Sequence, residues 1–230
     1  MIMEDKGTNK FKHLIRRFAS KKLITSERSE VNPLLEVVSL GDVTQLNTAN
    51  TNYSFGGLHR VFQRTFGKLK IIERKIDNVL ILGFGAGSVA SILVEEMHMN
   101  PRIKGVELDP VVIRLGKEYF NTERFADLEL IEADAAGYMN SEEEDYDLII
   151  VDVYVDFEVP GSCETSAFIS DLCSSLRSGG MVIFNKLIYN HKSRDEAKEI
   201  EIKFRKMNGT LELLKIREGM TNRMMVFEKP

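Results

Sequence analysis

The sequence predicts an α/β fold: a doubly wound, seven-stranded, mostly parallel sheet with a small N-terminal β-hairpin before it. From residue 77 onward, short apolar runs alternate with amphipathic segments, which is the order that right-handed crossovers in a parallel sheet require. Only a short turn, residues 217–222, separates the last two apolar runs. One of these two strands must therefore run antiparallel.

The composition is that of an ordinary globular protein and argues against several functional classes. The chain has 230 residues, 43% hydrophobic and 29% charged, and a formal net charge of −4. This acidic balance argues against a dedicated nucleic-acid-binding protein. The two cysteines, Cys163 and Cys173, lack the spacing of metal ligands. Because no apolar run reaches the roughly 18 residues of a membrane span, we expect a cytoplasmic protein without a metal site.

Residues 1–30 form a basic N-terminal extension. Phe11, Leu14, Ile15 and Phe18 recur at spacings of three and four among many lysines and arginines. This pattern predicts a short amphipathic helix with a basic outer face. We expect it to dock on its own domain or on a neighbouring subunit. The alternative is an anchor for an anionic surface or a nucleic acid.

Residues 31–70 are expected to form a β-hairpin and a connecting helix. Two β-rich runs, residues 34–40 and 43–46, flank the turn formers Gly41 and Asp42. A polar loop should follow over residues 47–57, and then a helix over residues 58–69.

Residues 71–230 contain the predicted sheet and the helices that cover it. We expect the strands at residues 79–82, 103–108, 128–132, 148–153, 181–184, 211–216 and 224–227. Helices are expected at residues 89–97 and 193–207, and a third begins at Pro110 with Asp109 as its N-cap.

A glycine-rich turn follows the first strand of this sheet, at the edge where ligands of doubly wound sheets bind. Gly83, Gly85 and Gly87 lie between a strand and a helix, where the backbone has to turn tightly and approach a ligand closely. Ser88 stands where a dinucleotide fingerprint has its third glycine or alanine. The turn therefore favours a nucleoside sulfonium such as S-adenosylmethionine over a nicotinamide dinucleotide, which remains a distant alternative.

Acidic residues end the next two strands and complete a candidate nucleoside pocket. Glu107, 24 residues beyond Gly83, is placed to accept hydrogen bonds from both ribose hydroxyls, and Leu108 follows it. Asp134 ends the third strand. It either receives an adenine amino group or caps the following helix.

With these residues in place, the chain resembles the class I S-adenosylmethionine-dependent methyltransferase fold, which is Rossmann-like. More narrowly, it is similar to the spermidine synthase (polyamine aminopropyltransferase) superfamily. The resemblance covers about residues 34–190. It rests on the hairpin, the loop of residues 52–59, the glycine turn, residues 152–160, Thr165, Phe168, Gly179, Gly180 and Asn185. It implies S-adenosylmethionine or its decarboxylated form as cofactor, a small-molecule acceptor and a homodimer.

The chain departs from the aminopropyltransferase pattern at three places. Ala86 stands where that superfamily has an aspartate that holds the amine of decarboxylated S-adenosylmethionine. Losing one such carboxylate costs about 1.5–3 kcal/mol. Asp152 and Asp156 are more widely spaced than the superfamily's acidic motif, and residues 58–60 read Leu-His-Arg instead of Tyr-His-Glu. These departures favour transfer of a methyl group.

The acceptor side is predicted from the fourth strand and the loop after it. Asp152 ends an apolar run and is the candidate catalytic residue, which would orient an attacking amine and accept its proton. The alternative is a carboxylate that only pins the following loop. Asp156, with Glu158, would add negative charge. Tyr53, His59 and Tyr154 are candidates for lining the same cleft. Residues 142–145, all acidic, are expected to be a solvated loop without a function.

Three functions remain open at this point. The preferred one is an S-adenosylmethionine-dependent methyltransferase that acts on a small nucleophile such as an amine. The first alternative is a spermidine synthase-type aminopropyltransferase that uses the decarboxylated cofactor. The second alternative is a non-catalytic nucleoside-binding protein.

Overall fold

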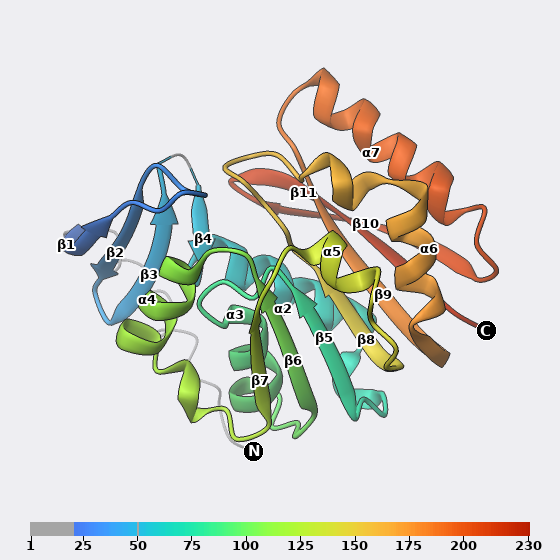
Figure 1. The fold of residues 1–230 in the computed structure, drawn as a ribbon, viewed down its shortest axis with the longest axis horizontal. Coiled ribbons are helices and arrows are strands. Elements are labelled where there is room, and N and C mark those ends of the chain that lie inside the picture. The colour runs from blue at the N-terminus through green and yellow to red at the C-terminus, as the bar shows by residue number, and fades with distance from the viewer. Residues whose placement is uncertain (1–20, 50) are drawn as a thin grey trace, which may run out of the picture.

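The computed structural model describes residues 21–49 and 51–230, which form two β-sheets with helices around the larger one (Figure 1). The predicted amphipathic helix around Phe11 and Phe18 lies outside the described residues. The small sheet is antiparallel with strand order β1-β2-β3-β4, and the large sheet has the order β10-β11-β9-β8-β5-β6-β7. No helix in the described part of the chain is long and apolar enough to cross a membrane.

The small sheet contains the predicted hairpin and extends it on both sides. Its strands are β1 (Lys21–Glu27), β2 (Leu35–Leu40), β3 (Val43–Thr48) and β4 (Asn52–Ser54). The expected hairpin is β2 and β3, joined at Gly41 and Asp42. Residues 21–27, for which no element was predicted, form a strand paired with β2, and residues 52–54 form a strand where a loop was expected, so that expectation was wrong in detail. Both pair with a free edge of the hairpin, which local sequence does not reveal.

The large sheet has the predicted seven strands. They are β5 (Asn78–Leu82), β6 (Arg102–Glu107), β7 (Leu128–Glu132), β8 (Tyr146–Val151), β9 (Leu176–Ile188), β10 (Thr210–Glu218) and β11 (Met220–Glu228). Strands β5 to β9 are parallel, and β11 runs antiparallel to both β9 and β10, as the short final turn predicts. Strand β9 is longer than expected, so that Gly179 and Gly180 lie inside it.

Helices cover both faces of the large sheet. They are α2 (Gly57–Leu69), α3 (Ser88–Ser91) with a π-helical turn (Ile92–Glu96), α4 (Pro110–Phe120), α5 (Ala135–Met139), α6 (Ser166–Ser174) and α7 (His191–Phe204), with short 3₁₀ turns η1 (Ile71–Glu73), η3 (Thr122–Arg124) and η4 (Gly161–Glu164). Helices α2 and α3 pack in one apolar cluster, and α5, α6 and α7 in the other. Strand β5 alternates between them: Val79 and Ile81 face the first, Leu80 and Leu82 the second.

Helix α4 joins the large sheet to the small one. Val112 and Leu115 of α4 pack against Leu35 and Val37 of β2. Asp109 caps the helix as predicted, because its Oδ1 accepts a hydrogen bond from the Val111 amide at 2.9 Å. The cap therefore fixes the start of the helix that carries the small sheet.

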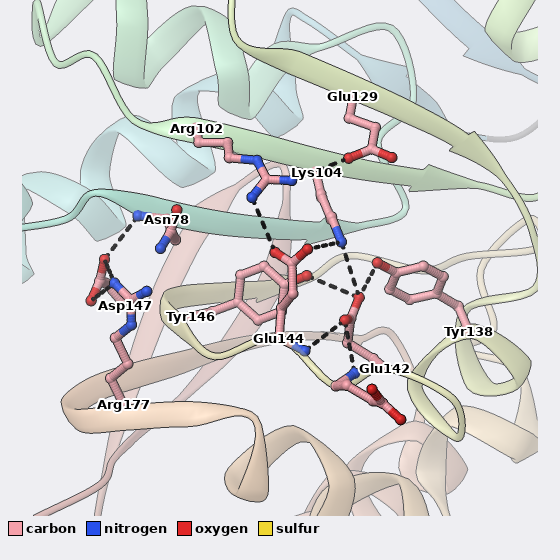
Figure 2. A network of polar contacts seen from close by, with 11 residues as sticks. Asn78, Arg102, Lys104, Glu129, Tyr138, Glu142, Glu144, Tyr146, Asp147 and Arg177 are labelled. Atoms are coloured by element: carbon pink, nitrogen blue, oxygen red, sulfur yellow. Dashed lines mark hydrogen bonds and ion pairs between the residues drawn. The ribbon is translucent and has the colours of Figure 1, made fainter.

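The acidic run at residues 142–145 is not simply a solvated loop. The Glu142 side chain is only 5% exposed and lies 3.7 Å from the Lys104 ammonium. It also accepts hydrogen bonds from the hydroxyls of Tyr138 and, at 2.9 Å, Tyr146 (Figure 2). Glu144 pairs with the same lysine at 2.7 Å. The expectation for Glu142 was wrong because β6 places a buried lysine beneath this loop, which its own sequence cannot show.

Candidate active site

The glycine turn after β5 lies directly against the end of β8. Gly83 has a φ of 81°, and a β-carbon there would lie 2.2 Å from the carbonyl oxygen of Asp152. Gly85 has a φ of 58° and faces Tyr53 of β4. Gly87, with a φ of 90°, packs against the rings of Phe84 and Phe125. Gly83 and Gly85 line a cleft that Tyr53 and Asp152 also line.

Glu107, at the end of β6, is buried beside this turn. One carboxylate oxygen accepts a hydrogen bond from the Gly85 amide at 2.8 Å. The other accepts from the Asp109 amide at 3.1 Å, and the Tyr53 hydroxyl lies 3.5 Å from it. Burial raises the pKa of Glu107, and these backbone hydrogen bonds oppose that shift. Each carboxylate oxygen can accept more than one hydrogen bond, so Glu107 is able to receive a ligand hydroxyl as well.

A pair of serines, whose contact the sequence did not indicate, connects the small sheet to the glycine turn. Ser54 of β4 accepts a hydrogen bond from the Ala86 amide at 3.2 Å, and its hydroxyl lies 3.1 Å from that of Ser88. The Ser88 hydroxyl also accepts from the Phe55 amide at 2.6 Å. This Ser54–Ser88 clasp holds β4, and therefore Tyr53, against the turn.

A hollow bordered by Glu107 extends along the ends of β6 and β7. Leu108 and Asp134 line it, together with Tyr53, Gly83 and Tyr154. The Leu108 side chain is exposed, and the Asp134 side chain caps α5 by accepting a hydrogen bond from the Gly137 amide at 2.8 Å. Both roles weighed for Asp134 are thus geometrically compatible, because one carboxylate oxygen makes the cap.

Asp152 follows β8 and faces the side chain of Asn185 in β9. Its carboxylate accepts a hydrogen bond from the Asn185 amide group at 2.9 Å. Burial raises the pKa of Asp152 to about 7; the bond from Asn185 opposes this shift and the charge of Glu107 adds to it. A carboxylate with this pKa is a better proton acceptor at neutral pH than an ordinary aspartate.

Tyr154 ties the loop after β8 to β9. Its hydroxyl donates a hydrogen bond to the Asn185 carbonyl at 3.0 Å and accepts one from the Leu187 amide at 2.8 Å. Burial raises its pKa well above the ordinary value. The hydroxyl is thus used within the fold, and the residue contributes its side-chain surface to both hollows.

A cleft adjoins the hollow bordered by Glu107 and shares Tyr53, Gly83 and Tyr154 with it. Asp152 and Asp156 line this cleft, and Asp156 takes a left-handed backbone conformation with a φ of 58°. No lysine or arginine is among the described residues that line it.

The far end of the cleft is built by residues that sequence reasoning missed. Glu218, Met220 and Asn222 come from the β10–β11 hairpin. The Glu218 carboxylate pairs with Arg60 at 2.5 Å and with Arg64 at 2.9 Å, both from α2. The contact between α2 and the end of this hairpin is long-range, and no local signal in the chain predicts it.

Two residues expected at the acceptor side lie elsewhere. His59 lines a separate hollow, where its Nε2 is 2.6 Å from a Glu96 carboxylate oxygen and its ring stacks on Phe55 at 5.4 Å. Glu158 pairs with Lys192 at the surface at 2.9 Å. The structure thus brings together Tyr53, Asp152, Tyr154 and Asp156, but neither His59 nor Glu158.

The chain is similar in sequence to one protein family and to several known proteins. The family model described as "Spermine/spermidine synthase domain" matches residues 64–214. A probable polyamine aminopropyl transferase from Bifidobacterium longum is 28% identical over 168 residues, which are 69% of this chain and 36% of that relative. A tRNA1(Val) (adenine(37)-N6)-methyltransferase from Haemophilus influenzae is 30% identical over 74 residues, 32% of each chain. The chain therefore spans about a third of the length of these two relatives.

Solved structures of spermidine synthase have the same fold as this chain. A crystal structure of spermidine synthase in complex with the transition state analogue AdoDATO superposes with a TM-score of 0.71 and 16% identity, covering 91% of this chain and 74% of that one. At this identity the likeness shows the fold alone, and it confirms the predicted fold class. Since the family model spans well over half of the chain, this protein belongs to the spermine/spermidine synthase family.

Proposed function

We propose that this protein is an aminopropyltransferase that uses decarboxylated S-adenosylmethionine and an amine acceptor. The observation that carries the proposal is the charge of the cleft. Asp152, Asp156 and Glu218 line it, and its described lining residues include no lysine or arginine. A cleft of this sign favours a cationic substrate, as an amine is at neutral pH. Glu218 is itself paired with Arg60 and Arg64, which reduces its own contribution to this charge.

The family match and the names of its relatives support aminopropyl transfer better than the methyl transfer that the sequence alone favours. Ala86 is one of the three departures from the aminopropyltransferase pattern that favour methyl transfer. In the structure, Ala86 is fully buried and packs with Leu35 and Leu115 in the apolar cluster beneath the small sheet. Ala86 lines neither hollow, and so the charge of the cleft depends on residues outside the glycine turn.

The proposed reaction assigns a role to each part of the site. Glu107 accepts hydrogen bonds from the ribose hydroxyls, and Asp134 and Leu108 border the adenine. The acceptor nitrogen attacks the aminopropyl carbon bonded to sulfur; the C–N bond forms, the C–S bond breaks, and methylthioadenosine leaves. Asp152 orients the attacking amine and takes its proton. Catalysis is then positioning together with electrostatic stabilisation.

Methyl transfer from S-adenosylmethionine is the second candidate, supported by Ala86 and by the short match to a methyltransferase. The two donors differ only in the carboxylate of the tail, so calorimetric titration with each separates them. We expect tighter binding of the decarboxylated donor, because the acidic cleft disfavours a carboxylate. Tighter binding of S-adenosylmethionine would overturn the proposal in favour of methyl transfer.

Turnover is tested with the decarboxylated donor and diamines by following methylthioadenosine release. Asp152→Asn should keep the affinity for the donor and lose most turnover. Glu123→Gln, a change at a surface glutamate whose side chain is 72% exposed, is the matched control and should leave both unchanged. Tight donor binding with no transfer to any amine would instead support the hypothesis of a non-catalytic nucleoside-binding protein.

A further inference from the structure

A second groove lies between α7 and the β10–β11 hairpin, away from the proposed active site. Leu213 of β10 pairs with Met225, which belongs to the apolar cluster under α7. Leu214 and Ile216 instead pack with the cluster under α2. The groove is therefore on the α7 face of the sheet, where Figure 1 shows α7 beside β10 and β11.

Among the ionisable side chains that line this groove, the basic ones predominate. They include His191, Arg194, Lys198, Lys215, Arg217 and Arg223. The one acidic residue among the described lining residues, Glu201, is already paired with Arg223 at 2.5 Å. This concentration of positive charge is local, because the chain as a whole has a net charge of −4.

Three of these cations are free to bind an anion. Lys198 pairs with Asp195 at 2.9 Å, but within the described part of the chain the side chains of Arg194, Lys215 and Arg217 form no ion pair. All three are exposed. Several uncompensated cations around one groove create a field that attracts an anionic partner.

The groove also borders a free sheet edge. Strand β10 is the edge strand of the large sheet, and in the described part of the chain it pairs with β11 alone. Its outer edge therefore presents backbone N–H and C=O groups without a strand partner. The Arg217 carbonyl is an exception, because it accepts a hydrogen bond from Arg64 at 2.7 Å. The exposed apolar side chain of Leu213 lies beside Lys215 and Arg217 on the same face of this strand.

We propose that this groove binds an extended acidic peptide segment of a partner protein, which adds to β10 as a further strand. The partner's backbone pairs with the free edge, its carboxylates meet Arg194, Lys215 and Arg217, and its apolar side chains cover Leu213. This surface is separate from the proposed reaction, since it lies on the other face of the sheet from the cleft.

A peptide fits these observations better than a nucleic acid does. The sugar-phosphate backbone of a nucleic acid lacks the regular series of amide groups that pairs with a strand edge. The aromatic side chain in the groove, Tyr189, already packs on Phe157 with ring centroids 5.5 Å apart, and its hydroxyl lies 3.4 Å from Glu158. It is therefore not a free platform for stacking a base.

The test uses a fluorescein-labelled peptide of alternating glutamate and valine, about as long as the nine residues of β10. We expect saturable binding by fluorescence anisotropy that weakens as salt is added. We also expect slower amide hydrogen exchange in β10. The same peptide with its central residue replaced by proline should bind at least about 10-fold more weakly, because proline removes a donor from the ladder. Equal binding of both peptides, or unchanged exchange in β10, would overturn the proposal.

Charge-reversed variants locate the binding surface. Lys215→Glu with Arg217→Glu, and separately Arg194→Glu with Lys198→Glu, should each weaken peptide binding about 10-fold or more. The matched control is Lys22→Glu with Lys68→Glu, two exposed lysines outside the groove, which should bind normally. Equal loss in the control would show non-specific attraction. Tighter binding of a labelled oligothymidylate than of the peptide would assign the groove to nucleic acid and contradict the proposal.

Nucleoside binding separates this proposal from the proposed function. Both charge-reversed pairs should titrate with decarboxylated S-adenosylmethionine as the unmodified protein does, and should keep its melting temperature. Loss of peptide binding with donor binding intact is the expected result. If the Lys215→Glu, Arg217→Glu variant lost both peptide binding and donor binding, its changes would have disturbed the β10–β11 hairpin, which borders both the groove and the cleft. The Arg194→Glu, Lys198→Glu variant then tests the proposal, because it leaves β10 and β11 unchanged.

Discussion

The carboxylate of Glu107 accepts a hydrogen bond from the backbone amide of Gly85 at 2.8 Å. The acidic residue proposed to hold the ribose is therefore also a support of the glycine turn, and these two parts of the proposed nucleoside site form one unit. A ligand that binds Glu107 meets a carboxylate whose orientation is already fixed by the backbone, which lowers the entropy that binding has to offset.

Replacing Glu107 by glutamine tests this unit. One end of the glutamine amide can only donate, and it would face either the Gly85 or the Asp109 amide, which also donate. We expect nucleoside affinity to fall about 10–100-fold, from the loss of about 1.5–3 kcal/mol in a hydrogen bond to a charged group. Calorimetry with S-adenosylmethionine and its decarboxylated form measures this change. Unaltered affinity for both would exclude Glu107 as a ligand for the ribose.

The contact between Gly83 and Asp152 gives a second prediction. An alanine at position 83 would have a positive φ and would also place its β-carbon 2.2 Å from the Asp152 carbonyl oxygen. Gly179 is the matched control, because its φ is 74° and, apart from its chain neighbours, no described residue has an atom within 4 Å of a β-carbon there. We expect Gly179→Ala to lower the free energy of unfolding by about 1–2 kcal/mol, and Gly83→Ala to lower it further. If urea denaturation showed the same decrease in the free energy of unfolding for both variants, the loop after β8 would move to accommodate the β-carbon without a measurable loss of stability.

The pKa of Asp152 predicts a pH dependence. Burial raises this pKa from 3.8 to about 7, so the proton-accepting carboxylate forms as the pH rises through about 7. Turnover at low substrate should increase across that range in the unmodified protein and should be nearly absent at every pH in Asp152→Asn. A pH–rate profile of methylthioadenosine release measures this. A rate that is constant between pH 6 and pH 8 would contradict the role of Asp152 as base.

The same raised pKa has a consequence for stability. The folded protein holds the Asp152 proton more tightly than the unfolded chain does. The resulting stabilisation is fully present below the unfolded pKa of 3.8 and is lost as the pH rises through about 7. Relative to Asp152→Asn, the unmodified protein should therefore become progressively less stable between these values. Chemical denaturation of both proteins at several pH values tests the sign.

The buried ion pair of Lys104 and Glu142 gives a further prediction. Lys104→Met would leave the Glu142 carboxylate, which is 5% exposed, without its cation, and breaking such pairs costs about 3–5 kcal/mol. Lys104→Met with Glu142→Leu should cost less than the two single changes together, because neither charge remains buried. Lys75→Met is the control: its partner Asp77 is 61% exposed, and such surface pairs contribute about 1 kcal/mol or less. Additive costs in urea denaturation would show that the pair is not coupled.

Much of the fold follows from local sequence. The buried strands of a parallel sheet read as continuous apolar runs, and the cap at Asp109 needs only its neighbouring amides. Strands β1 and β4 were missed because they exist only by pairing with the hairpin. Glu142 was misread because its cation lies in a distant strand.

Helix α2 shows why the acceptor side was harder to predict. Leu58 and Val61 line the cleft, whereas His59 and Gln63 line the hollow beside Glu96. Neighbouring residues in a helix point about 100° apart, so adjacency to the loop of Tyr53 did not place His59 in the same site. Which side of the helix faces the cleft is decided by the packing of α2 on the sheet.

The Ser54–Ser88 clasp connects detachment of the small sheet to the proposed nucleoside site. If β4 moves away from the glycine turn, Tyr53 leaves both hollows, and the Ala86 and Phe55 amides lose their acceptors. By thermodynamic linkage, a bound nucleoside that contacts Tyr53 must then make this opening rarer by the same factor by which opening weakens its binding. Protease cleavage in the segment between β1 and β4 would accordingly slow in proportion to ligand occupancy. The rate of cleavage in the small sheet would therefore report how much of the protein has a nucleoside bound.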